Sequence, residues 1–303
     1  MSKHAYLIMA YSEYEQLKML IKMLDYPGND IYVHIDKKSP KIEVKELEDG
    51  VKYSKIFKYQ KYPIYWGHYS QTKCEVFLLE QAVKQGYDYY HLISGADLPL
   101  CSQGEIHSFF DKFAGKEFVR YWGPTFPKQC ESWLKIYHPL QKLLRATSCG
   151  GVNLCFEYTE KVLELIQEKL KVNRLKKLDF ELQKGATWFS ITHQFAMYVV
   201  SQKEWINRCF KNTRSSDEVF IQTLLHNSCF EKNRFENTYE IDGLTGTRYI
   251  DWTRGKPYTF EEQDFEELIN CGFLFARKFS LSKDKNIVYK LYDYVTGKNK
   301  AEL

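Results

Sequence analysis

Two segments in the second half of the chain hold residues whose types and spacing could carry catalysis. The first, 215–220, reads Ser-Ser-Asp-Glu-Val-Phe and is typical of a helix start, with a serine N-cap and two acids in the first turn. The second, 184–190, combines small residues with Trp188 and Phe189 and is typical of a loop that leads into a buried strand. Acids in the first turn also interact well with the helix dipole, so Glu218 has a structural explanation beside a catalytic one.

Hydrophobic periodicity predicts an α/β arrangement that would position these segments. The predicted strands are 4–11, 30–36, 62–66, 88–94, 117–122, 239–241, 247–252 and 273–279. The predicted helices are 13–24, 71–85, 159–175, 192–210 and 218–225, and 123–152 is expected to be a long irregular loop. The opening strand-helix-strand unit is how a parallel, nucleotide-binding sheet begins. Glycine-rich phosphate loops are absent, which argues against a dehydrogenase or a P-loop enzyme.

Polar residues follow several of the predicted strands. The residues expected at this edge are Asp36, Lys38, Tyr65, Ser94 and Asp97. Ligands of open α/β sheets bind at the carboxyl ends of the strands. A single aspartate at a strand end is most often a turn or cap residue. Five polar residues at one edge indicate a ligand site.

The composition indicates a globular protein with a substantial core. The chain has 303 residues, 44% of them hydrophobic, and a net charge of +4 with lysines and acids interleaved, which does not suggest a nucleic-acid-binding face. The eight cysteines show no CxxC pair, so free thiols in a reducing compartment are expected. No signal peptide or apolar run of about 18 residues is present, and a cytoplasmic location is expected.

No linker or internal repeat divides the chain. We therefore expect a single domain over 1–303, with a nucleotide-binding half at about 1–122 and an acceptor-binding and catalytic half at about 123–303. Acceptor specificity is expected to lie in the irregular stretch 123–152.

Several short motifs follow one another along the chain in a characteristic order. They are His34–Lys38, Tyr65–Gly67, Ser94–Pro99, Lys184–Phe189, Asp217–Glu218, Arg248–Trp252 and Phe275–Phe279. No single motif is specific, but in this order and spacing they resemble the Core-2/I-branching enzyme and peptide O-xylosyltransferase family, glycosyltransferase family 14. The resemblance extends from the first predicted strand to Phe279 and is closest to a bacterial-type cytoplasmic member.

The resemblance implies a GT-A-type fold, with a central mixed, mostly parallel sheet flanked by helices. It also implies inverting transfer from a UDP-sugar without a metal or other cofactor. Most GT-A enzymes hold a divalent cation with an Asp-x-Asp motif, whereas 95–97 offers only Asp97. A single carboxylate is compatible with a cation bound through a diphosphate, so a metal-dependent enzyme using Asp97 is the alternative.

The resemblance also assigns residues to the reaction. Glu218 matches the catalytic base, which removes the proton of the acceptor hydroxyl, and Asp217 is interpreted as a structural residue of the helix start. Arg248, Arg277 and Lys278 match the basic positions that stabilise the departing UDP. Adjacent residues of a regular strand point to opposite faces, which favours Lys278 over Arg277.

The remaining assignments concern the two substrates. Asp36 is expected to contact the uracil or ribose, Lys38 the phosphate, and Tyr65 to pack on the nucleotide. Trp188 and Trp252 are expected to contact the acceptor or the transferred sugar, although a buried tryptophan is more often part of a core. Thr187 differs from the acid that the xylosyltransferase branch has before this tryptophan, and UDP-GlcNAc is the expected donor.

The expected acceptor is a glycan or a lipid-linked oligosaccharide. A lipid-linked acceptor would allow peripheral association with the inner face of a membrane, and no nucleic-acid partner is expected. A further hypothesis is a non-catalytic protein that binds nucleotide sugars or glycans through the aromatic residues of 121–137. Loss of turnover in Glu218→Gln would separate an enzyme from such a binding protein.

Overall fold

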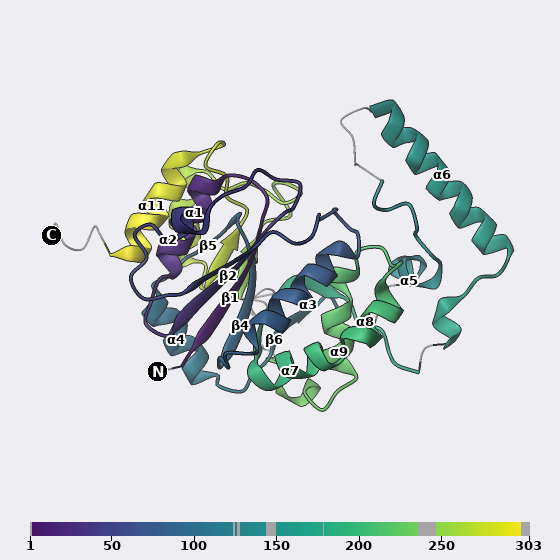
Figure 1. The fold of residues 1–303 in the computed structure, drawn as a ribbon, viewed down its shortest axis with the longest axis horizontal. Helices are drawn as coiled ribbons and strands as arrows, with labels where there is room; N and C mark the ends of the chain where they lie inside the picture. Colours follow the sequence, from purple (N-terminus) through teal and green to yellow (C-terminus); the bar gives the residue numbers. More distant parts are fainter. Residues whose placement is uncertain are drawn as a thin grey trace.

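The computed structural model describes residues 2–123, 125, 128–143, 150–177, 179–235 and 247–297. Its centre is a six-stranded sheet in the order β3-β2-β1-β4-β7-β6 (Figure 1). The strands are β1 (His4–Ala10), β2 (Asn29–Ile35), β3 (Ile56–Tyr59), β4 (Tyr89–Ser94), β6 (Phe118–Tyr121) and β7 (Gly185–Thr192). Strands β3, β2, β1 and β4 are parallel, whereas β7 is antiparallel to β4 and β6. The predicted mixed, mostly parallel sheet is confirmed.

A second, three-stranded sheet brings the C-terminal part of the chain to the carboxyl end of β4. Its strands are β5 (Asp97–Pro99), β9 (Phe275–Arg277) and β8 (Arg248–Ile250), in that order. Asp97 lies opposite Arg277 in the β5–β9 pair. Because β5 follows β4 almost directly, the second sheet adjoins the edge at which the polar strand ends were predicted.

Apolar side chains alternate between the two faces of the central strands. In β1, Tyr6 and Ile8 pack in one core, and Ala5 and Leu7 pack in the other. Successive side chains of a strand point to opposite faces, so a strand that is buried on both faces is apolar throughout. This burial explains the continuous apolar runs from which the strands were predicted.

Helices cover both faces of the sheet. They are α1 (Tyr14–Leu24), α2 (Val44–Glu48), α3 (Ser70–Ala82), α4 (Gln103–Lys112), α5 (Ser132–Lys135), α6 (Gly150–Lys169), α7 (His193–Ser201), α8 (Lys203–Phe210), α9 (Phe220–His226), α10 (Phe265–Asn270) and α11 (Lys285–Thr296). Short 3₁₀ helices are η1 (Lys128–Cys130), η2 (Arg174–Lys177), η3 (Ser216–Glu218), η4 (Glu231–Asn233) and η6 (Glu262–Asp264). Helices α1, α4, α10 and α11 contribute to one core, and α3, α7, α8 and α9 contribute to the other.

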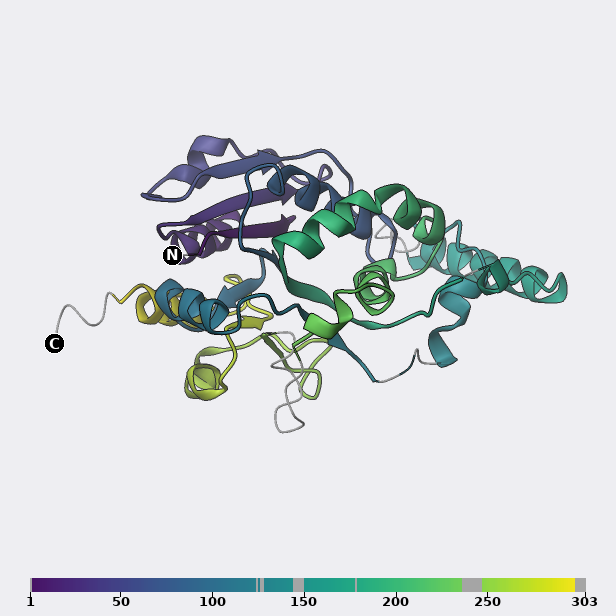
Figure 2. The same cartoon turned by 90° about the horizontal axis from the view of Figure 1, so that it is seen from below.

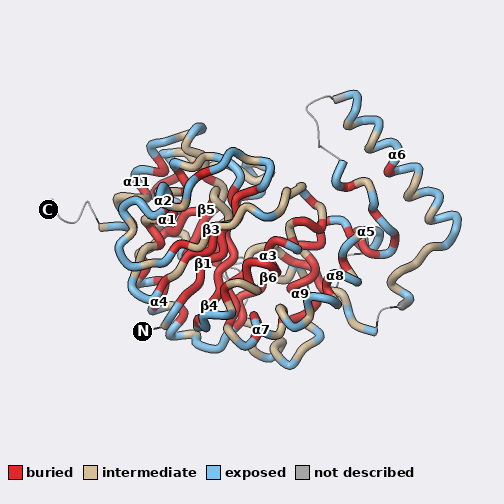
Figure 3. The backbone as a smooth tube through the Cα atoms, in the orientation of Figure 1, coloured by how far each residue is buried: buried red, intermediate tan, exposed pale blue. Residues whose placement is uncertain are grey.

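Helix α6 projects from the body at the opposite end of the molecule from α11 (Figure 2). Its apolar side chains Leu154, Tyr158 and Leu165 are largely exposed, as Figure 3 shows for most of the helix. Among the residues of α6 whose burial is described, Glu160 alone is buried. Within the described part of the chain, no helix combines the length and the apolar character that a membrane span requires.

The predicted strand 62–66 is wrong. This segment is irregular, and the strand at the edge of the sheet is β3, a few residues earlier. Pro63 has no N–H to give to a ladder. The neighbouring backbone groups instead bind the turn after β2, because Tyr62 accepts from Lys37 N–H over 3.0 Å and Ile64 donates to Asp36 over 3.3 Å.

Other boundaries also differ from the prediction. The predicted helix 192–210 is two helices, α7 and α8, separated at Gln202. Helix α6 begins at Gly150, so the stretch predicted as irregular contains η1, α5 and the start of α6. The predicted helix 218–225 is a 3₁₀ turn followed by α9. The predicted strand 239–241 lies outside the described residues.

Candidate active site

The carboxyl edge of the parallel strands gathers residues predicted to bind a nucleotide. Asp36, directly after β2, donates its backbone N–H to Ala10 at the end of β1 over 2.8 Å. Its buried carboxylate accepts N–H bonds from Lys38 (2.9 Å) and Ile64 (3.3 Å). The Lys38 ammonium lies 3.5 Å from this carboxylate and 4.2 Å from the centre of the Tyr65 ring. The structure thus brings Asp36, Lys38 and Tyr65 together.

Asp97 is fully buried where β5 begins. Its carboxylate accepts hydrogen bonds from the N–H (2.7 Å) and the hydroxyl (3.0 Å) of Ser94. The Nε of Arg277 lies 3.5 Å from the same carboxylate, and the guanidinium lies 4.3 Å from the centre of the Trp188 ring. Burial raises the pKa of Asp97, and the charge of Arg277 opposes that rise. A divalent cation bound here would have to share the carboxylate with Arg277.

The two adjacent acids of η3 have different environments. Asp217 is buried and accepts hydrogen bonds from Thr187 Oγ1 (3.0 Å) and Gln71 Nε2 (3.3 Å). Glu218 is 29% exposed at its side chain and forms an ion pair with Lys184. Asp217 therefore anchors the segment, whereas Glu218 is the acid that a substrate can reach.

Lys184 is almost completely buried, which is rare for a lysine. Its ammonium contacts the carboxylate of Glu218 and lies 3.8 Å from the centre of the Trp122 ring and 4.7 Å from that of Trp133. The carboxylate and the two aromatic faces offset the cost of removing the ammonium from water. Lys184 thereby holds a fixed positive charge against Glu218.

Gly185 lets the chain pass very close to β6. A Cβ at this position would lie 1.7 Å from the carbonyl oxygen of Arg120, so no larger residue fits without moving the backbone. The backbone N–H of Trp122 donates to the carbonyl of Lys184 over 3.0 Å. This close approach fixes the backbone from which Lys184 extends to Glu218.

A further buried carboxylate interacts with Asp217. Glu75 of α3 is fully buried, and neither of its oxygens has a hydrogen-bond partner among the described residues. Burial raises the pKa of Glu75 well above its ordinary value, and the charge of Asp217 raises it further. Burial and then the charge of Glu218 raise the pKa of Asp217 to about 6. The buried carboxyl groups of Asp217 and Glu75 are therefore harder to ionise than ordinary acids.

Gly67 connects the loop of Tyr65 to the segment that holds Glu218. It follows Tyr65 in the same loop, and its carbonyl accepts the N–H of Ser215 over 2.8 Å. Gln71 accepts the N–H of Gly67 over 2.6 Å and also donates to Asp217. The loop that holds Tyr65 is therefore bonded directly to the segment that holds the candidate base.

Arg248 lies in the core between β4 and β7. Its guanidinium donates to the carbonyls of Leu92 (3.1 Å) and Phe189 (2.8 Å) and to the hydroxyl of Ser190 (2.8 Å). Burial lowers the pKa of Arg248 to about 10, and the charge of Asp97 opposes that change. These contacts explain Arg248 as a structural residue. Its contact with a diphosphate stays a prediction, which this burial does not favour.

Lys278 and Trp252 lie beyond the ends of the second sheet. Lys278 follows the last residue of β9, so strand alternation does not determine the direction of its side chain. The residue is partly exposed. Trp252 follows β8 and is 56% exposed. The exposed ring is available to a ligand, and the roles of both residues stay predictions.

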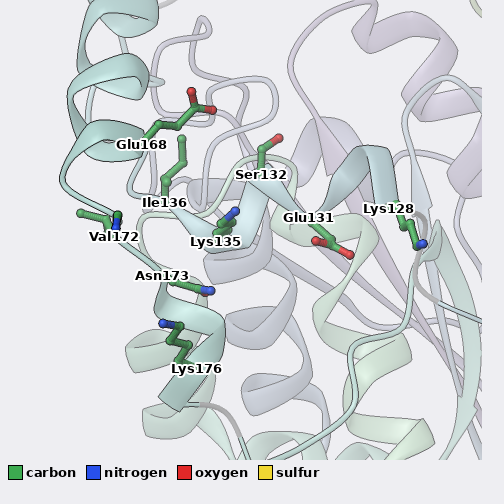
Figure 4. Close-up of a pocket in the computed structure, with 10 residues that line it drawn as sticks. Lys128, Glu131, Ser132, Lys135, Ile136, Glu168, Val172, Asn173 and Lys176 are labelled. Carbon is green, nitrogen blue, oxygen red and sulfur yellow. The ribbon is translucent and has the colours of Figure 1, made fainter.

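A separate pocket of about 540 Å³ lies between α5, the end of α6 and η2 (Figure 4). It is lined by Lys128, Glu131, Ser132, Lys135, Ile136, Glu168, Lys171, Val172, Asn173 and Lys176. None of the predicted site residues lines it. Part of its wall, 128–136, belongs to the segment expected to bind the acceptor.

Lys184 and Glu75 were not predicted as site residues. Lys184 precedes a strand in an irregular segment, where no periodicity reports burial. A signal for Glu75 did exist, because it lies four residues before Leu79 and so belongs to the inner face of the predicted helix 71–85. A charged residue in that position indicates a buried, functional or paired carboxyl group.

The sequence profile described as Branch: Core-2/I-Branching enzyme matches residues 4–269. The chain therefore belongs to the Core-2/I-branching enzyme family, as the motifs indicated. Its relatives include Xylosyltransferase 2 of Homo sapiens, 21% identical over 97% of this chain and 34% of that protein. They also include Xylosyltransferase oxt of Drosophila pseudoobscura pseudoobscura, 20% identical over 95% of this chain and 32% of that protein. The chain spans about a third of the length of these relatives.

Among solved structures, the crystal structure of mouse Xyloside xylosyltransferase 1 in its apo form aligns with 90% of this chain and 96% of that chain. The two share 11% of their residues, with a TM-score of 0.36.

Proposed function

We propose that this protein is an inverting, metal-independent glycosyltransferase that moves a sugar from a UDP-sugar to a hydroxyl of a glycan or lipid-linked acceptor. Membership of the Core-2/I-branching enzyme family supports this class of reaction. The observation that carries the proposal is the placement of Glu218. It is a partly exposed carboxylate, paired with a buried lysine and held in a segment bonded to the loop of Tyr65.

Glu218 acts as the general base of the transfer. Its carboxylate takes the proton of the acceptor hydroxyl as that oxygen bonds to the anomeric carbon of the donor. The bond from this carbon to the β-phosphate oxygen breaks, and UDP leaves with the electron pair. No second acid is required, because UDP departs as a stable anion. Lys184 contacts Oε2 of Glu218 and keeps the carboxylate in a fixed position.

Cationic residues stabilise the charge that develops on the departing UDP. Arg277, held between Asp97 and the Trp188 ring, and the partly exposed Lys278 are the residues assigned to this role. The pairing of Asp97 with Arg277 supports a metal-free site, because it occupies the carboxylate that the alternative mechanism needs.

The expected donor is UDP-GlcNAc, and UDP-xylose is the second candidate. Thr187 donates a hydrogen bond to the buried carboxylate of Asp217. An acid at position 187, which the xylosyltransferase branch has, would place a second carboxylate beside that of Asp217. The site of this protein therefore differs from that of the xylosyltransferase branch. The relatives named xylosyltransferases favour the second candidate.

Calorimetric titrations with UDP, UDP-GlcNAc and UDP-xylose, in EDTA and in Mn²⁺, test donor and metal dependence together. We expect one UDP-sugar to bind with the same affinity in both buffers and Lys278→Met to weaken that binding. Binding that requires Mn²⁺ would assign the diphosphate to a metal at Asp97. Binding without release of UDP, even with candidate acceptors, would favour the non-catalytic alternative.

A further inference from the structure

Three ionisable side chains meet where α6 contacts the loop after α5. The Nδ1 of His138 lies 3.2 Å from Oε1 of Glu160 and 3.4 Å from Oε1 of Glu164. His138 and Glu160 are buried, and the side chain of Glu164 is 32% exposed. The two glutamates are one turn apart on α6, so both extend from the same side of the helix.

The other ring nitrogen of His138 determines what Nδ1 can do. Nε2 lies 3.0 Å from the carbonyl oxygen of Ser132, and a carbonyl only accepts, so Nε2 carries the proton. In a neutral ring Nδ1 then presents a lone pair to two carboxylates. Three acceptors that face one another in a buried place repel, unless a cation or a further proton lies between them.

We propose that a Zn²⁺ ion binds between His138, Glu160 and Glu164. Tetrahedral zinc bonds of about 2.0 Å place neighbouring ligand atoms about 3.3 Å apart, close to the two observed distances. All three ligand atoms lie within 4.8 Å of one another. One imidazole and two carboxylates are donors that zinc accepts, and the partly exposed side of Glu164 leaves the fourth position to water.

Surrounding hydrogen bonds hold His138 and Glu160 in place. The bond from His138 to a backbone carbonyl is the contact that usually orients a metal-binding histidine. Gln167 exchanges two 2.8 Å hydrogen bonds with the backbone of Tyr137, next to His138. The second oxygen of Glu160 accepts the N–H of Leu140 over 3.3 Å. The loop and the helix are therefore already aligned for an ion.

The ion would attach α6 to the body of the protein. Among the residues of α6 whose burial is described, only Glu160 is buried, and most of the others are exposed. The site shares no residue with those assigned to donor binding or to proton transfer, so it leaves the metal-free transfer mechanism unchanged. The wall of the pocket between α5, the end of α6 and η2 includes Ser132 and Glu168, so zinc would also fix the shape of that pocket.

Metal titrations of the EDTA-stripped, desalted protein test this site. Zn²⁺ should bind the wild type at one ion per chain and raise its melting temperature by several degrees. Co²⁺ should give the intense visible absorption of a tetrahedral ion with a nitrogen ligand. Glu164→Gln should weaken zinc binding by about tenfold or more, whereas the matched control Glu157→Gln, an exposed acid of the same helix, should bind like the wild type.

The opposite results would overturn the site. Equal zinc affinity of the wild type and Glu164→Gln, or only the weak spectrum of octahedral Co²⁺, would show that the ion does not bind between His138, Glu160 and Glu164. His138→Gln should abolish the cobalt spectrum. If that buried change prevents folding, Glu164→Gln decides alone, because its side chain is partly exposed.

Discussion

Asp217→Asn should make the protein more stable at neutral pH. Burial and the charge of Glu218 raise the pKa of Asp217 from 3.8 to about 6. Between these two values the folded protein keeps a proton that the unfolded chain has released, so folding becomes less favourable as the pH rises. The difference between the two pKa values corresponds to a cost of about 3 kcal/mol, which is fully present above about pH 7.

Asparagine removes this cost and keeps the geometry. Its amide oxygen can accept from Thr187 and Gln71, and its amide nitrogen takes the place of Oδ1, which has no hydrogen-bond partner among the described residues. The stability difference between Asp217→Asn and the wild type should therefore grow by about 1 kcal/mol between pH 5 and pH 7.

Urea unfolding of both proteins at a series of pH values from 5 to 8 measures this difference directly. The curve should rise up to about pH 7 and then become flat, because above that pH both states of the wild type are ionised. Glu157→Gln, a change at an exposed acid, serves as the control. A difference that does not change with pH would refute the assignment of a buried, hard-to-ionise Asp217.

Three further substitutions test the surroundings of the site. Lys184→Met should lower kcat by about tenfold to a hundredfold and leave the Kd of UDP nearly unchanged, because the base loses its fixed position; an equal loss in both would contradict this role. Gly185→Ala should reduce stability by about 3 kcal/mol in urea unfolding, since its methyl group would overlap the Arg120 carbonyl; normal stability would refute the close approach. Arg248→Met should cost about 3–5 kcal/mol in the same assay without changing UDP affinity in the folded protein; a selective loss of affinity would restore Arg248 to the diphosphate site.

The parallel part of the sheet could be predicted because its strands are buried on both faces. Strands β1, β2 and β4 are each rich in apolar and aromatic residues, and their ends place Asp36 and Asp97 at one edge without further information. The edge strand β3 was missed in favour of 62–66, since aromatic residues there suggest a strand while Pro63 prevents one. Irregular segments bound by tertiary contacts give no periodic signal.

The candidate site could be predicted only where motifs mark it. Glu218 and Asp217 are adjacent in sequence, and the difference in exposure that separates them arises from Thr187, Gln71 and Lys184, which come from other segments. Arg248 shows the same limit. The family resemblance assigned it to the departing UDP, but long-range folding places it among backbone carbonyls inside the core.

Glu218→Gln tests most directly whether Glu218 is the base of sugar transfer. The assay measures the release of UDP from the UDP-sugar that binds in the calorimetric titrations. Asp217→Asn, at the neighbouring residue, is the control variant. We expect Glu218→Gln to lose about 10²–10⁴-fold in turnover while its UDP affinity stays within the error of the wild type, and Asp217→Asn to retain most activity. Full turnover in Glu218→Gln would contradict the account, and the base would have to be sought elsewhere at this edge of the sheet.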